Sequence, residues 1–190
     1  MTQPSTCTAF AGDRRLAGGP PATVVLAVRR HLAQHPADGV LVFDDTTGQG
    51  VDFDLGDSDQ AALARLALHP VYGAPPAPPR GRGRPRLGVV AREVTLLPQH
   101  WDWLATQPGG ASVTLRRLVD AARRSGPDRA KQAREAAYRF LAAIAGNAPG
   151  YEEATRALFA GDRARFEHLV AAWPADIRQH ALGLARDGLS

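Results

Sequence analysis

The sequence contains one cysteine, one methionine and one lysine, and it has no long uninterrupted apolar run. A single cysteine, Cys7, excludes an intramolecular disulfide framework. No stretch approaches the roughly 18 to 20 consecutive apolar residues of a membrane-spanning helix, so we expect no membrane segment. The N-terminal residues lack a basic start followed by an apolar run, which argues against a secretory signal. A cytoplasmic location is the simplest expectation.

Acidic residues are missing from one stretch of the chain, residues 73–92, which carries five arginines and a net charge of +5. Residues 1–72 carry five arginines and eight aspartates, a net charge of −3, and residues 93–190 carry +2. The overall apolar content of 44% and charged content of 22% are ordinary for a globular protein. Such segregation of charge favours a polyanionic partner over an even spread of weak contacts.

The first 72 residues predict a small α+β domain with antiparallel strands and one main helix. Gly12 and Asp13 form a turn signal between two short strand-like runs, and the two prolines at 20 and 21 open an amphipathic helix. Asp57 or Ser58 is suited to cap a second, shorter helix. The predicted strands are 6–11, 14–17, 40–44 and 51–55, and the predicted helices are 22–35 and 57–68.

Residues 73–88 consist mostly of proline, glycine and arginine. A segment of this composition buries too little apolar surface to offset the entropy lost on ordering, so we expect a flexible basic linker.

Residues 89–190 predict a mainly helical domain made of one short strand and five or six helices. The strand is expected at 92–97 and ends at Pro98, and Ser112 is expected to cap the second helix. Trp101 and Trp103 cannot share one helical stripe, so one should be core and the other free to pack elsewhere. The predicted helices are 99–107, 113–124, 128–146, 151–161, 162–173 and 175–186.

The linker resembles an AT-hook, a short motif with a Gly-Arg-Pro core that inserts arginines into the narrow minor groove of A·T-rich DNA. Glycine lets the backbone approach the groove floor, and proline keeps the chain extended. The outer arginines would contact phosphates. The alternative is a mobile tether whose arginines only add solubility. The residues expected to contact DNA here are Arg80, Arg82, Gly83, Arg84, Pro85 and Arg86.

The order of elements in residues 92–124 resembles a ribbon-helix-helix, in which two chains pair their strands into a DNA-reading ribbon. In that arrangement Arg92 points outward, and the start of the second helix, near Ser112, meets phosphates. The strand departs from the pattern because Val94 and Leu96 would point outward with Arg92, and apolar side chains cannot read base edges by hydrogen bonds. A dimerisation unit without base readout, or helices merely in a similar order, are the alternatives.

Four strings resemble an uncharacterised bacterial family, the domain of unknown function 2239 family. They are TAFAGDRRLAGGP, LVFDDTTGQGVDFDL, GRPRLGVVAREVTLLPQHWDWLATQPGGASVTLRRLVDAARR and ALFAGDRARFEHLVAAWPADIR, and they run from near the first residue to near the last. The resemblance brings no established activity with it.

Metal sites and catalytic groups are weakly indicated. His31 and His35 stand four residues apart on the predicted helix 22–35, a spacing that can bind zinc, but a solvated helix end is the simpler interpretation. His180 is expected to be a surface or packing residue. Four aspartates flank the predicted hairpin and are interpreted as an acidic solvent face rather than a cation site; they are Asp44, Asp45, Asp52 and Asp54.

We therefore predict an α+β, non-enzymatic protein that binds DNA, preferably A·T-rich, as a regulator or nucleoid-associated protein and that forms homodimers. Arg92 and Ser112 join the linker residues as expected DNA contacts, and no metal or cofactor is expected. The alternative is a protein-interaction adaptor that dimerises through its helical domain, and a metal-dependent enzyme using the aspartates is the third hypothesis. The predicted domains are 1–72, a linker at 73–88, and 89–190.

Overall fold

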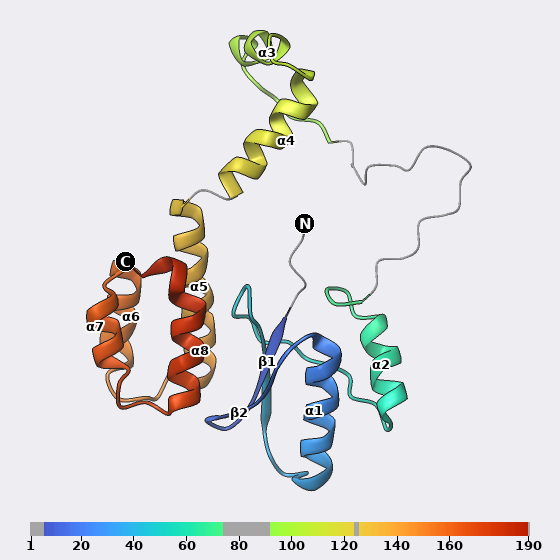
Figure 1. Cartoon of the computed structure of the whole chain (residues 1–190), viewed down its shortest axis with the longest axis vertical. Coiled ribbons are helices and arrows are strands. Elements are labelled where there is room, and N and C mark those ends of the chain that lie inside the picture. Colours follow the sequence, from blue (N-terminus) through green and yellow to red (C-terminus); the bar gives the residue numbers. More distant parts are fainter. Residues whose placement is uncertain (1–5, 74–91, 124–125, 190) are drawn as a thin grey trace. The chain divides into compact units, whose positions relative to one another are not determined.

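The computed structural model describes residues 6–73, 92–123 and 126–189, which contain a three-stranded antiparallel sheet and eight α helices (Figure 1). The protein is α+β, as the sequence predicts. Its elements are β1 (Cys7–Ala11), β2 (Arg14–Gly19), α1 (Pro21–Gln34), β3 (Val40–Asp44), α2 (Asp59–Ala67), α3 (Pro98–Ala105), α4 (Gly110–Arg123), α5 (Gly126–Ile144), α6 (Tyr151–Ala160), α7 (Arg163–Leu169), α8 (Ala175–Ala185) and the 3₁₀ turn η1 (Arg186–Gly188).

The sheet is built around β1, which pairs antiparallel with β2 on one side and with β3 on the other. The hairpin between β1 and β2 turns at Gly12, whose φ of +58° suits glycine. Four consecutive residues of β1, Cys7 to Phe10, are buried, so this strand is covered on both faces. An apolar run of this kind is typical of a strand with no solvent-facing side.

The two faces of the sheet belong to two different hydrophobic cores. Cys7 and Ala9 of β1 pack with Val24 and Val28 of α1. Because successive strand residues point to opposite faces, Phe10 lies on the other face and packs with residues of α5 to α8. Figure 1 shows α1 on one side of the strands and α5 with α8 on the other. The sheet is therefore the middle layer between helices from both ends of the chain.

Aromatic rings fill the centre of this second core. The Phe140 ring of α5 lies 5.4 Å from that of Phe10 and 4.9 Å from that of Phe43, centroid to centroid. All three side chains are fully buried. Their contacts join residues about 100 positions apart into one packed unit.

The chain thus divides into two compact units, one of residues 1–74 with 126–190 and one of residues 75–125. This division differs from the predicted boundaries at 72 and 89, because α5 to α8 share one hydrophobic core with β1 and β3. The sequence indicates that β1 and β3 are buried, but strand periodicity does not say which distant helices cover them.

The second unit, as far as it is described, is a helical hairpin of α3 and α4. Gly109 and Gly110 form the turn with φ values of +90° and +74°, a backbone region that side chains rarely adopt. Leu104 is its only fully buried large apolar residue among residues 92–123.

Three local predictions need correction. Residues 51–55 form no strand and only an isolated bridge joins Phe43 to Gly50. Residues 92–97 form no strand either, because no other described segment offers them a backbone ladder. Ser112 does not cap α4, since that helix already begins at Gly110. By contrast, Ser58 caps α2 as predicted, its hydroxyl accepting a hydrogen bond from the Ala61 N–H at 3.1 Å.

Candidate functional site

The basic segment that the sequence singles out lies outside the described residues. The AT-hook hypothesis therefore rests on the sequence alone. The predicted DNA contacts concerned are Arg80, Arg82, Gly83, Arg84, Pro85 and Arg86.

The other two predicted DNA contacts belong to the second unit. Arg92 precedes α3 and is exposed, and Ser112 is the third residue of α4 and is also exposed. Both side chains are accessible to a partner. Arg116 and Arg117, on the same helix as Ser112, are exposed as well, so α4 presents further positive charge close to the predicted contact.

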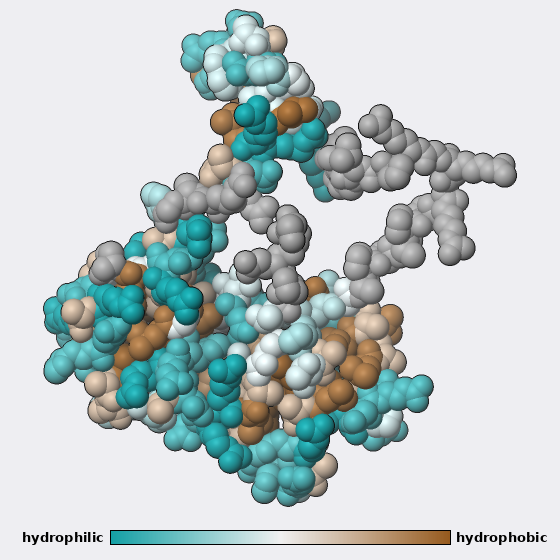
Figure 2. All heavy atoms as spheres, in the orientation of Figure 1, coloured by the Kyte–Doolittle hydropathy of each residue, from teal (hydrophilic) through white to brown (hydrophobic). Residues whose placement is uncertain are grey.

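Six large apolar side chains are exposed in residues 92–123 of the second unit. The tryptophans are among them, 41% exposed at Trp101 and 50% at Trp103, so the prediction that one of them is core is wrong for the single chain. Leu104 occupies the interior instead. Brown apolar side chains interrupt the teal surface of this unit in Figure 2. The apolar set consists of Val94, Leu97, Trp101, Trp103, Leu118 and Val119.

The four aspartates do not gather around one point. Asp44 accepts hydrogen bonds from the backbone N–H and hydroxyl of Thr47, whereas Asp45 accepts one from the hydroxyl of Thr8. Asp54 pairs with Arg65 instead. Among residues 6–73, 92–123 and 126–189, no three His, Cys, Asp or Glu side chains come together as a metal site requires. Asp44, Asp45 and Asp54 therefore serve separate local contacts.

Asp44 forms the best-connected of these contacts. It is 8% exposed, and its second oxygen accepts a hydrogen bond from the Tyr72 hydroxyl at 2.6 Å. Burial alone would raise the pKa of the Asp44 carboxyl, but the hydrogen bonds from Tyr72, Thr47 and Thr46 outweigh it and hold the pKa below its usual value. Burial and the neighbouring Asp44 also raise the pKa of Tyr72. This bond fixes the last described residues before the basic segment to the sheet.

The candidate zinc pair on α1 makes a simpler contact. The rings of His31 and His35 lie 4.9 Å apart, and the Nε2 atom of His31 lies 2.8 Å from a carboxylate oxygen of Asp38. Asp38 follows the helix, so this contact ties down the chain where α1 ends.

Cys7 is unsuited to nucleophilic chemistry. Its side chain is completely buried, and burial, with smaller contributions from Asp45 and Asp44, raises the pKa of the thiol to about 12. A thiol in this state is not ionised at neutral pH and behaves as a small apolar core residue.

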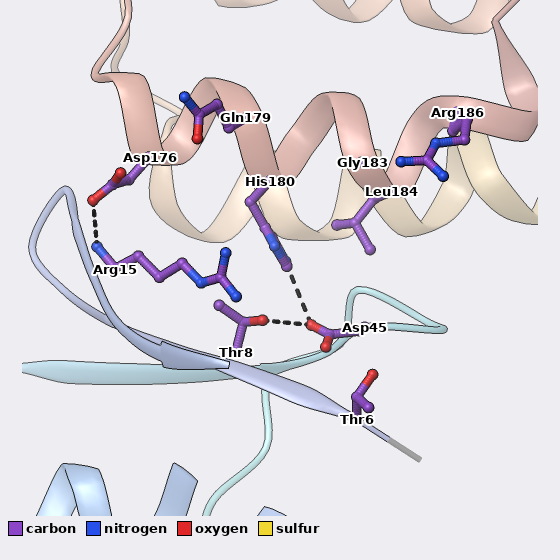
Figure 3. Close-up of a pocket in the computed structure, with 10 residues that line it drawn as sticks. All are labelled: Thr6, Thr8, Arg15, Asp45, Asp176, Gln179, His180, Gly183, Leu184 and Arg186. Carbon is purple, nitrogen blue, oxygen red and sulfur yellow. Dashed lines mark hydrogen bonds and ion pairs between the residues drawn. The ribbon is translucent and has the colours of Figure 1, made fainter. Parts of the chain in front are cut away.

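Sequence reasoning missed one group of polar residues, which comes from three distant parts of the chain. Thr8 of β1, Asp45 just after β3 and His180 of α8 lie together where the sheet meets α8 (Figure 3). No spacing in the sequence links position 180 to positions 8 and 45. Only the packing of α8 on the sheet brings them together.

None of the helices among the described residues is long and apolar enough to cross a membrane. No curated protein and no solved structure matches the chain. A family model described as an uncharacterised protein conserved in bacteria matches residues 6–185, which include nearly every described element of both units. Because this match covers far more than half of the sequence, the chain belongs to the domain of unknown function 2239 family, DUF2239.

Proposed function

We propose that the protein is a DNA-binding regulator that acts without catalysis. In this proposal Arg82 and Arg84 enter the minor groove, Arg80 and Arg86 contact phosphates, and the helical unit of residues 92–123 pairs with a second copy. The observation that carries the proposal is that an acid-free segment of net charge +5 leads directly into a unit that exposes most of its large apolar side chains.

The size and burial of the second unit support self-association. The second unit comprises residues 75–125, and a unit this small is only marginally stable by itself because it buries a limited fraction of its surface. The only cysteine, Cys7, lies in the other unit. A second copy would cover the exposed apolar set.

Charge placement supports DNA as the ligand of the paired unit. Pairing doubles the number of basic segments in one particle, and two linked weak sites bind far more tightly than one. Arg92, Arg116 and Arg117 are exposed and available to phosphates. Phosphate contacts of this kind make binding strongly dependent on salt.

A binding titration against A·T-rich and G·C-rich duplexes at several salt concentrations tests the proposal. We expect an A·T preference and a steep salt dependence. Arg84→Ala should weaken binding by about 1–3 kcal/mol and reduce the A·T preference, whereas Arg80→Ala should weaken binding to all duplexes alike. Arg84→Lys keeps the charge but loses the flat guanidinium, so it should also reduce the preference.

The matched control is Arg156→Ala, which removes the same charge from an exposed helix of the first unit. It should leave DNA binding close to that of the parent. Equal binding by the parent, Arg84→Lys and a variant with residues 80–86 scrambled would show that the arginines act only as diffuse charge, and the minor-groove proposal would be wrong.

Self-association is tested separately by sedimentation of the full chain at tens of micromolar. The parent should sediment as a dimer, and Leu118→Glu should shift it toward the monomer because a charge would be buried in the interface. Leu68→Glu is the control, since Leu68 is 84% exposed on the first unit. A monomeric parent would refute the pairing.

A protein-interaction adaptor is the second candidate. It is favoured by a further exposed aromatic pair, Tyr138 of α5 and Phe159 of α6, whose ring centroids lie 5.4 Å apart. A dimer that binds no duplex even at low salt would support the adaptor and exclude the regulator.

A further inference from the structure

A polar cavity of about 680 Å³ lies between the sheet and α8, lined entirely by residues of the first unit. This volume is within the range of small-molecule sites, roughly 300–1,000 Å³. Figure 3 shows its walls: β1 and β2 on one side and α8 on the other. The lining residues are Thr6, Thr8, Arg15, Asp45, Asp176, Gln179, His180, Gly183, Leu184 and Arg186.

One hydrogen-bonding atom in this cavity has no partner. The Nε2 atom of His180 is buried and makes no hydrogen bond, although Asp45 Oδ1 lies 3.8 Å away. That separation is too long for a direct bond, but an oxygen placed about 2.8 Å from both atoms would bond to each. Asp45 Oδ1 is already held in place by the Thr8 hydroxyl at 2.7 Å. A ligand hydroxyl would therefore find two oriented partners.

The His180 ring cannot easily turn to find another partner. Its side chain is only 11% exposed, and it packs against the rings of Phe10 and Phe140 at centroid distances of 5.4 and 4.6 Å. These contacts hold the imidazole edge toward Asp45. The unsatisfied atom is thus a fixed feature of the cavity wall.

Two guanidinium groups at the cavity have no carboxylate partner among the described residues, those of Arg15 and Arg186. The acids beside them are already bonded: Asp176 accepts the backbone N–H of Arg15 at 2.8 Å, and Asp45 accepts the Thr8 hydroxyl. The Arg15 guanidinium lies over Gly18, where a Cβ would overlap it. Figure 3 shows Arg15 reaching to the side of His180.

A glycine keeps one wall of the cavity open. Gly183 lies inside α8, where glycine is less favourable than alanine, yet a Cβ built there would meet no atom within 4 Å. The helix therefore gives up some stability at a position that faces open space. A larger side chain there would enter the cavity without displacing the protein.

We propose that this cavity binds a small hydroxylated organic anion, a sugar phosphate or a hydroxycarboxylate, whose acidic group pairs with Arg15 and whose hydroxyl bridges His180 and Asp45. Guanidinium groups are suited to both phosphate and carboxylate. The proposal goes beyond DNA binding and does not depend on it, because every lining residue belongs to the first unit.

Isothermal titration of the full chain without DNA tests the proposal. The probes are ribose 5-phosphate and gluconate, with ribose and inorganic phosphate as partial probes that lack the anion or the carbon-bound hydroxyls. One of the two full probes should bind, and which one does so identifies the acidic group. Each partial probe should bind at least about tenfold more weakly, because it loses one set of charged or hydroxyl contacts.

Two variants locate the binding. Arg15→Gln should weaken binding of the full probe by about tenfold, because a charge-assisted pair is lost. Arg14→Gln, at the preceding residue, should leave this binding unchanged. Gly183→Leu should abolish it while retaining the helix content of the parent by circular dichroism. If neither full probe binds at millimolar concentration, the proposal is overturned. Equal effects of Arg14→Gln and Arg15→Gln, or binding that survives Gly183→Leu in a folded protein, would overturn it as well.

Discussion

The two units of this protein differ in how completely they bury their large apolar side chains. The first unit places a sheet between helices and buries rings such as Phe10, Phe43 and Phe140 completely. The second unit, in residues 92–123, buries Leu104 but leaves both of its tryptophans exposed. The first unit thus has a closed core within one chain, whereas the described part of the second exposes most of its large apolar side chains.

In our proposals the two units have different roles. A closed core with a polar cavity suits recognition of a small molecule, because its walls are held by packing on both sides. An uncovered helical hairpin beside a basic segment suits assembly on a polyanion. The first unit consists of an N-terminal and a C-terminal segment of the chain. Helix α5, the first helix of the C-terminal segment, joins them because its Phe140 packs in the same core as Phe10 and Phe43.

The largest effect is expected from Phe140→Ala, which removes the ring that joins the sheet to the C-terminal helices. It should lower the free energy of unfolding by about 3–5 kcal/mol, as truncation of a buried aromatic does. Urea unfolding checks this. Phe159→Ala, at a residue 48% exposed, should cost only about 0.5 kcal/mol. Similar costs for the two variants would mean that the first unit is not held together by this core.

A smaller loss is expected from Tyr72→Phe, which removes the hydroxyl that donates to the second oxygen of Asp44. A hydrogen bond to a charged, buried group contributes about 1.5–3 kcal/mol, so the free energy of unfolding should fall by that amount. The pKa of the Asp44 carboxyl should also rise, because one of the bonds that lowers it is lost. Tyr138→Phe, which removes an exposed hydroxyl with no described hydrogen bond, is the control. No difference between the two would refute the role of the contact.

Ser58 and Ser112 allow a comparison between a serine that caps a helix and one that lies inside the first turn of a helix. Ser58→Ala should destabilise the first unit by about 1 kcal/mol, because it removes the side-chain cap of α2. Ser112→Ala should have almost no effect on stability, since α4 begins two residues earlier. Thermal unfolding of both variants distinguishes them. A large cost at Ser112 would mean that α4 starts later than the structure shows.

The smallest effect concerns pH and His180. Burial lowers the pKa of its imidazole, Arg15 lowers it further, and Asp45 opposes the shift. The folded state therefore binds its proton less tightly than the unfolded chain, whose histidines titrate near about 6.5. Stability from this group is present above that pH and is lost as the pH falls toward the folded pKa.

Urea unfolding between about pH 7.5 and about pH 5.5 should thus show falling stability in the parent and a shallower fall in His180→Gln. His168→Gln, at an exposed histidine, should follow the parent. Asp44 does not confuse the comparison, because its lowered pKa places its own loss of stability at a more acidic pH. An identical pH dependence in parent and His180→Gln would refute the assignment.

Much of the secondary structure could be predicted because its causes are local. The hairpin needs a turn residue such as Gly12, the main helix needs proline at its start and apolar residues on one side, and Ser58 supplies a cap. The strand at 51–55 was wrong because alternation of apolar and acidic residues does not guarantee a neighbouring strand. The strand at 92–97 was wrong as well, because a strand forms only where a neighbouring backbone completes the ladder of hydrogen bonds.

The sequence by itself determined the α+β class, most helix boundaries and the concentration of positive charge in residues 73–92, since composition and short-range periodicity are enough for each. Only the tertiary structure decided that the C-terminal helices cover the sheet and that Arg15, Asp45 and His180 meet at one cavity. The reason is physical: an apolar strand sequence shows that both faces of the strand are buried, but which helices pack on those faces depends on how their side-chain volumes fit together. That fit joins residues more than 130 positions apart, and no local pattern records it.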